Sequence, residues 1–436
     1  MKKTILFGTL LLSSSLFGQD VSEIERCYSH KAIEYQESLT PGYADHVDEQ
    51  FQIAKAYQQT KTNKSQHFTI PVVVHVVYNT PEQNLADSVI YKQIETLNQD
   101  YLRLNADTIN MRGDFNIVKG SPNIQFMLAQ IDPSGNPTSG ITRTQTSATS
   151  FGDIGAFTGD FSTLETVKQT AEGGIDPWDQ DHYLNIWVCN MEVFGIPALL
   201  GYATPPSGLP NWPAGSVPNL SDGVVIQYQA FGSNNPNDLD MGQGPLDVRG
   251  RTTTHEVGHY LGLRHIWGDG DCTEQDGIDD TPNASDQSQF DCDDTKNTCT
   301  DNIQNTDLPD MIENYMDYSS EVCQNSFTQG QVDLMRGVLE NQRYDLVHDN
   351  PASLESENMI SASLYPNPAD SKITIQLNNG SADEVVIYNL NGAKLNSIEQ
   401  QNEAYTVDVS QFEKGIYFAK ILKEGVLIST QKFVKL

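Results

Sequence analysis

Apolar positions recur along this chain with two spacings, one typical of strands and one of helices. The uninterrupted β-branched run at residues 70–78 predicts a buried strand. A helix should follow, with Asp87 or Ser88 as its cap, because the next apolar residues lie three or four positions apart: Ile90, Ile94, Leu97 and Tyr101. Further segments are expected at residues 124–131, 183–191 and 223–228 as strands and at residues 248–261 as a helix.

This pattern changes after the helix at 248–261. Residues 266–327 are rich in Asp, Asn and Cys and show no clear periodicity. Thr328 and Gln331 then form a capping-box pair that opens another helix, with Val332, Met335 and Leu339 on one face. We therefore expect an irregular segment between two helices.

The last part of the chain shows short alternating strands separated by turn signals. They lie at residues 373–377, 384–388, 405–409, 416–421 and 426–433. This pattern predicts a small all-β sandwich over residues 361–436, joined by a polar linker at 349–360. The predicted fold class is an α+β domain at residues 67–348 followed by this sandwich.

The N-terminus has the features of an export signal. Residues 1–18 combine two lysines, a short apolar run and a small residue before Gln19, which is typical of a signal peptide. Residues 19–66 are polar, favour helix and end in a cleavable polar stretch, which suits a removable pro-segment. No later run is long and apolar enough for a transmembrane helix. The protein should therefore be secreted, extracellular or attached to the cell surface.

Length and charge narrow the possible functions. A chain of 436 residues is expected to form more than one folded unit. Its formal net charge of −32 argues against binding to nucleic acid or to anionic membranes. Between residues 266 and 321 there are 16 carboxylates and one lysine, Lys296. Such a density of like charges calls for solvation or for a bound cation.

Residues 255–265 (HEVGHYLGLRH) carry the clearest chemistry. His255 and His259 lie four apart, so one helix face can present both imidazoles to a metal ion. Gly262 allows the chain to leave the helix in a left-handed conformation and to return His265 as a third ligand. Glu256 lies beside the site as a candidate general base. Three ligands leave one position open for water, which predicts a catalytic zinc site.

This motif is the metzincin signature, and residues 314–318 (NYMDY) resemble the metzincin Met-turn. Over residues 66–346 the chain most resembles bacterial members of the pappalysin family, in this motif, in residues 199–203 and in a four-cysteine loop. The resemblance implies that Met316 supports the imidazoles and that Tyr318 stabilises the oxyanion. It also implies a metzincin-type catalytic domain with a twisted mixed sheet and a preference for basic residues after the cut.

Six cysteines follow the signal peptide. Cys189, in an apolar run, is expected to be a buried free thiol. The four in the irregular segment could pair in three ways by spacing alone; the resemblance implies Cys272–Cys299 and Cys292–Cys323. It further implies that Cys27, in the pro-segment, caps the zinc and keeps the enzyme latent. An incidental cysteine that is lost with the pro-segment is the alternative.

Hard oxygen donors in the acidic segment suit calcium better than zinc. They are Asp269, Asp271, Asp279, Asp280 and Thr281, and their spacing differs from that of an EF-hand. The resemblance to the pappalysin family supports a structural calcium ion in this region.

The C-terminal segment begins LYPNP at residues 364–368 and ends KFVKL. It resembles the sorting domain of type IX secretion substrates, which implies the outer-membrane secretion machinery as a partner. A carbohydrate-binding or spacer sandwich is the alternative.

These observations predict a secreted zinc-dependent metalloendopeptidase that hydrolyses extracellular proteins or peptides. The alternatives are a secreted adhesin or metal-binding protein on an inactive protease scaffold, and a glycan-binding protein that depends on the C-terminal sandwich.

Overall fold

The computed structural model describes residues 26–59, 66–197, 199–206, 221–242, 244–348, 361–378, 381–389, 394–402, 404–423 and 426–436. The predicted signal peptide, the predicted linker and both ends of the predicted pro-segment lie outside these residues. The chain divides into two compact units, residues 1–352 and 353–436.

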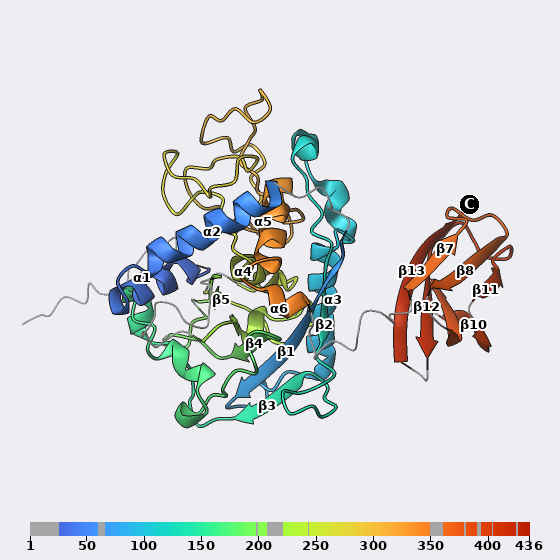
Figure 1. Cartoon of the computed structure of the whole chain (residues 1–436), viewed down its shortest axis with the longest axis horizontal. Helices are drawn as coiled ribbons and strands as arrows, with labels where there is room; N and C mark the ends of the chain where they lie inside the picture. The colour runs from blue at the N-terminus through green and yellow to red at the C-terminus, as the bar shows by residue number, and fades with distance from the viewer. Residues whose placement is uncertain are drawn as a thin grey trace, which may run out of the picture. The chain divides into compact units, whose positions relative to one another are not determined.

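A mixed sheet forms the centre of the first unit (Figure 1). Its strands are β1 (Phe68–Tyr78), β2 (Ile124–Leu128), β3 (Ile141–Gln145), β4 (Leu184–Cys189), β5 (Gly201–Ala203) and β6 (Val224–Gln227). The order is β2-β1-β4-β6-β5, and β3 pairs with the second half of β1. All pairs are parallel except β5 with β6, so the three-residue strand β5 is an antiparallel edge.

Six α-helices are described in this unit. They are α1 (Ser29–Leu39), α2 (Tyr43–Gln59), α3 (Asp87–Tyr101), α4 (Arg251–Tyr260), α5 (Gln329–Leu339) and α6 (Tyr344–Val347). Short 3-10 helices occur at Ala106–Asn110, Gly113–Ile117, Ile154–Thr158, Leu164–Lys168, Thr170–Glu172 and Tyr228–Ala230. Among the described helices, none combines the length and the apolar character that crossing a bilayer requires.

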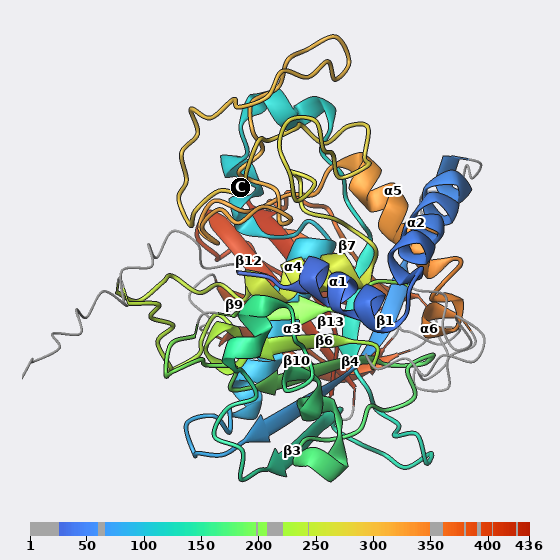
Figure 2. The same cartoon turned by 90° about the vertical axis from the view of Figure 1, so that its left-hand side faces the viewer.

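Two apolar cores lie on opposite faces of the sheet, because successive side chains of a strand point to opposite sides. On β4, Ile186 and Val188 join the core that includes α3, α4 and α5, whereas Trp187 and Cys189 join the other core. The second core is covered by residues 151–175 and by α1. Figure 2 shows α1 near α4 and α2 beside α5.

The predicted elements are present, with shifted ends. The helix expected at residues 248–261 is confirmed as α4, with ends at Arg251 and Tyr260. The capping box of Thr328 and Gln331 is confirmed at the start of α5. The predicted cap of α3 was wrong: Ala86 is the N-cap residue and makes no side-chain cap bond, while Asp87 lies in the first turn.

The second unit is a sandwich of two antiparallel sheets, as predicted. One sheet has the order β10-β9-β12-β13 and the other β11-β8-β7. The strands are β7 (Ser361–Tyr365), β8 (Lys372–Asn378), β9 (Ala382–Asn389), β10 (Lys394–Asn402), β11 (Ala404–Asp408), β12 (Gly415–Lys423) and β13 (Val426–Lys435). Ile375 of one sheet and Ile387 of the other share one buried core. The sequence did not predict β7 or β10.

Candidate active site

Helix α4 presents two histidines to one point, and the turn after it brings a third. The Nε2 atoms of His255 and His259 are 3.0 Å apart, and that of His265 lies 3.3 Å and 3.1 Å from them. Gly262 has φ +92°, the left-handed conformation that the sequence required for this return. The three predicted ligands are therefore brought together.

Each of these histidines donates a hydrogen bond from its Nδ1 atom to an oxygen acceptor. His255 Nδ1 donates to the Tyr315 carbonyl at 2.7 Å, and His259 Nδ1 donates to the Leu263 carbonyl at 2.8 Å. His265 Nδ1 donates to Asp269 Oδ1 at 2.5 Å. These bonds fix the tautomer that leaves every Nε2 with a lone pair, as is usual for metal-bound histidines.

The geometry of the three nitrogens fits a metal ion. All three histidines are buried. Burial, followed by the neighbouring imidazoles, holds the pKa of His255 and of His259 well below its usual range. Three lone pairs within 3.3 Å repel one another unless a cation lies between them. Zn–N bonds of about 2.0–2.1 Å give tetrahedral nitrogen separations of roughly 3.3 Å, close to those found here.

Glu256 is buried beside this cluster. Its Oε2 accepts hydrogen bonds from Ser29 Oγ at 3.0 Å and from Cys27 Sγ at 3.2 Å. Its Oε1 has no hydrogen-bond partner among the described residues. Burial raises the pKa of Glu256 to about 8. Gly201 on β5 leaves room for this carboxylate, since a Cβ there would come within 2.9 Å of Oε1.

The turn at residues 314–318 lies under and beside the histidines. Met316 is fully buried, and a Cβ on Gly258 of α4 would come within 2.5 Å of its sulfur. Met316 therefore supports the helix that carries the ligands, at a position that only glycine allows. The ring of Tyr318 lies 5.0 Å from that of His265, and burial raises the pKa of its hydroxyl well above the usual range.

Cys27 reaches the same point as the histidines. Its Sγ and the three histidine nitrogens all lie within 4.8 Å of one another. The Tyr318 hydroxyl accepts from Cys27 N at 3.0 Å and donates to Cys27 O at 2.8 Å. Cys27 forms a parallel bridge with Gly201 of the edge strand β5. The N-terminal segment thus lies in the position that an extended peptide would take.

Arg26, next to Cys27, is buried beside the carboxylate of Glu321. Its guanidinium donates to Glu321 Oε1 at 2.7 Å and to the Ser319 carbonyl at 3.0 Å, and it is only 1% exposed. Glu321 also accepts from the main-chain nitrogens of Arg251 and Thr252, at the start of α4. One carboxylate therefore caps the metal-binding helix and neutralises the arginine.

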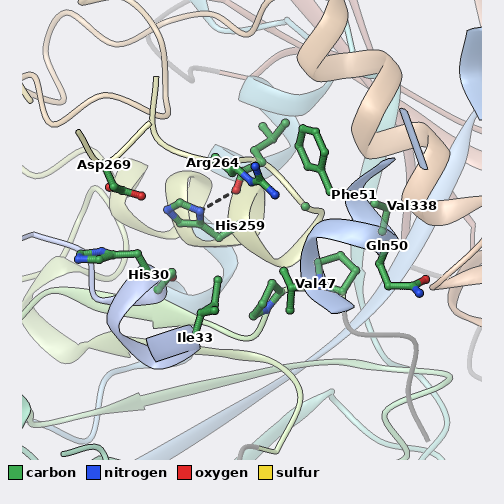
Figure 3. A pocket seen from close by; sticks show the side chains of 14 residues that line it. His30, Ile33, Val47, Gln50, Phe51, His259, Arg264, Asp269 and Val338 are labelled. Atoms are coloured by element: carbon green, nitrogen blue, oxygen red, sulfur yellow. Dashed lines mark hydrogen bonds between the residues drawn. The ribbon is translucent and has the colours of Figure 1, made fainter. Parts of the chain in front are cut away.

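Residues of α1 and α2 lie around His259 (Figure 3). A pocket beside His259 is lined by His30 and Ile33 of α1, by Val47 and Phe51 of α2 and by Arg264. Arg264 stacks on the Phe51 ring at 4.2 Å and pairs with Asp48 at 2.8 Å. The N-terminal helices are thus bound at a second place, away from Cys27.

The disulfides and free thiols follow the expected pattern. The structure pairs Cys272 with Cys299 and Cys292 with Cys323, the pairing that the family resemblance implied. Among the described residues Cys27 and Cys189 are free and buried, and Cys189 lies within β4.

The five residues suggested for calcium do not converge in the described structure. The Asp269 carboxylate accepts a hydrogen bond from His265 Nδ1. Asp271 accepts from the main-chain nitrogen and the hydroxyl of Thr273. Asp279 is exposed and pairs with Lys55, whereas Asp280 accepts from Gly330 N at the start of α5. Thr281 is buried and contacts Thr328. Several of these short side chains therefore accept hydrogen bonds from nearby groups, and the calcium ligands stay a prediction.

Two partners of the site were missed in the sequence. Asp269 stands four residues after His265, and this spacing could have suggested it as a partner of the third histidine. Asp100 of α3 accepts from Thr254 Oγ1 and from the Tyr315 hydroxyl. It thereby links Thr254, the residue before His255, to Tyr315, whose carbonyl accepts from the His255 ring. No local sequence pattern predicts this contact.

Two family models match the chain. Residues 172–340 match the M43 peptidase model described as pregnancy-associated plasma protein-A. Residues 363–436 match the secretion system C-terminal sorting domain.

Individual relatives point the same way. An extracellular metalloprotease of Arthroderma benhamiae is 29% identical over 318 residues, which cover 72% of this chain and 86% of that protein. Mature mirolysin of Tannerella forsythia, solved in complex with a cleaved peptide, is 42% identical with a TM-score of 0.54, covering 65% of this chain and 97% of that chain. A promirolysin mutant from the same organism is 38% identical with a TM-score of 0.60, covering 74% and 97%.

Proposed function

This chain belongs to the pappalysin family of metalloproteases, and on that basis we propose that His255, His259 and His265 hold a zinc ion with Glu256 as general base. The protein is a metalloendopeptidase of the extracellular space or cell surface, and it carries a sorting tail. The observation that supports the zinc proposal is the convergence of three Nε2 atoms within 3.3 Å, each ring held from behind by an acceptor.

Glu256 is the proton carrier in this proposal. Zinc, when bound, would lower the pKa of a coordinated water and polarise the scissile carbonyl. The Cys27 sulfur, 3.2 Å from Glu256 Oε2 and within 4.8 Å of the histidine nitrogens, marks where that water would lie. Glu256 takes the proton during attack and returns it to the leaving amine. Tyr318, once its hydroxyl is released from Cys27, donates to the developing oxyanion.

The domain boundaries follow from the same proposal. Residues 1–18 are the signal peptide, 19–66 the pro-segment and 67–348 the catalytic domain. Residues 349–360 are a linker, and residues 361–436 pass the protein to the outer-membrane secretion machinery. The hydrogen bonds of Cys27 to Glu256 and Tyr318 support the assignment of Cys27 as the latency switch.

Calcium remains a proposal for the acidic segment. Asp276 is 2% exposed, and its Oδ2 has no hydrogen-bond partner among the described residues. Burial, together with the negative charge of Asp280, raises its pKa to about 8. Asp276 Oδ1 accepts from Ile278 N, and its second oxygen is left for a cation, which makes Asp276 a better candidate for a calcium ligand than Asp269 or Asp271.

Chelation tests the zinc proposal directly. We expect 1,10-phenanthroline to abolish casein cleavage by the activated protein, and stoichiometric Zn²⁺ to restore it. A calcium-selective chelator is expected to lower the unfolding temperature instead, since a bound cation stabilises the folded state. Cleavage that persists after zinc has been removed, as checked by elemental analysis, would contradict the proposal.

Glu321 is expected to select basic side chains beside the cut, the preference that the family resemblance implies. Arg26 of the pro-segment already pairs with it in a buried position. The change Glu321→Gln keeps an acceptor for the start of α4 but removes the charge. It should lower kcat/KM about 10- to 100-fold for peptides with arginine at that position. For peptides with citrulline at that position, kcat/KM should change little. An equal loss of kcat/KM for both kinds of peptide would show a structural defect.

A further inference from the structure

Tyr28, the residue after Cys27, is buried in an apolar cluster of the first unit. The side chain is 1% exposed, and its ring centroid lies 6.3 Å from that of Phe161. The same cluster contains Phe151, Ala156, Leu164, Leu199 and Tyr202. An aromatic side chain buries about 150–250 Å² of surface. Removal of the N-terminal segment would therefore uncover a sizeable apolar hollow.

The wall of this hollow is held by contacts that do not involve the N-terminal segment. Phe161 meets Tyr202 edge to face, with centroids 5.5 Å apart and an angle of 84°. The Tyr202 hydroxyl donates to Glu165 Oε1 at 2.8 Å, and Glu165 pairs with the buried Lys168 at 2.9 Å. Because Phe161 packs against the Tyr202 ring and Glu165 holds the Tyr202 hydroxyl, this side chain cannot easily move into the space that Tyr28 would leave. The hollow should persist when Tyr28 leaves.

The hollow lies at a definite place along the cleft. Tyr28 N donates to the Gly201 carbonyl on the edge strand at 3.1 Å, and Cys27 faces the three imidazoles. Arg26, on the other side of Cys27, lies in the acidic position of Glu321. The two flanking side chains thus occupy environments of opposite character, one charged and one apolar.

We propose that the hollow formed around Phe161 and Tyr202 is a substrate subsite for an aromatic or large aliphatic side chain. It lies across the scissile bond from the basic side chain that Glu321 binds. An extended peptide on the edge strand β5 places one side chain where Tyr28 now lies. This inference rests on the proposed protease function and adds a second determinant of specificity to it.

Kinetics on a peptide series tests the inference. The activated protein is given fluorogenic peptides with arginine fixed beside the cut and with Tyr, Phe, Leu, Ala or Glu across it. Burial of a large apolar side chain should raise kcat/KM at least about tenfold for Tyr, Phe and Leu over Ala, and more over Glu. In Phe161→Ala the ratio of kcat/KM for the Tyr peptide to that for the Ala peptide should fall below about threefold, whatever the absolute rates.

Each outcome has a separate meaning. Efficient cleavage without any preference across the cut would overturn the subsite and leave the protease function intact. A lack of cleavage of every peptide would overturn both. If Phe161→Ala does not fold, Phe161→Leu offers a milder test, because loss of the aromatic contact should reduce the advantage of Tyr over Ala by a smaller factor. An unchanged preference order in a folded Phe161 variant would also overturn the assignment.

Discussion

Replacing Glu256 with alanine is expected to lower kcat at least about 1000-fold while the protein keeps its full complement of zinc. A positioned general base contributes about 10²- to 10⁴-fold. Asp269, the carboxylate bonded to the third histidine, accepts from its Nδ1 and so cannot replace Glu256. The three imidazoles do not depend on Glu256, since their Nδ1 atoms are held by Tyr315, Leu263 and Asp269. Metal content should therefore stay constant while turnover disappears.

The measurement needs activity and zinc content on the same sample. The pro-segment is removed by an added protease, so that the variant need not process itself. Glu172→Ala is a matched control, because Glu172 is an exposed acid in a short 3-10 helix of the same unit. Turnover in Glu256→Ala above about a tenth of the wild-type rate would exclude Glu256 as the base. Loss of zinc together with activity would instead assign it a structural part.

The local features of the site could be predicted from sequence because short spacings encode them. His255 and His259 share a helix face by their four-residue separation, and Gly262 predicts the turn that returns His265. The strand β1 and the helix α5 were equally accessible, since one shows a continuous β-branched run and the other a complete capping box. In each case a single segment contains all the information.

Features that depend on distant residues could not be predicted in this way. Arg26 and Glu321 are 295 positions apart, and nothing in either neighbourhood connects them. Strand β10 has few apolar positions and was missed, although its pairing with β9 gives it a place in the sandwich. Individual calcium ligands are hard to predict for a related reason, because turns in an irregular segment compete for the same carboxylates.

Replacing Cys27 with alanine in the full chain is expected to raise the activity of the uncut protein at least about tenfold and to hasten its maturation. The thiol lies within 4.8 Å of the three ligand nitrogens, and a thiolate there would bind zinc in place of water. Alanine leaves that coordination position free. Arg26 and helices α1 and α2 remain bound through Glu321 and Arg264, so the variant should be partly rather than fully active.

Cys189→Ala is the matched control, since Cys189 is also a buried free thiol but lies in β4, outside the ligand cluster. It should leave latency unchanged. A spectroscopic measurement separates ligation from simple covering: the cobalt-substituted full chain should show a thiolate-to-cobalt charge-transfer band that Cys27→Ala loses and Cys189→Ala keeps. If Cys27→Ala remains as latent as the wild type and the band is absent from both, then α1 and α2 alone close the cleft. In that case the sulfur above the histidines only fills space.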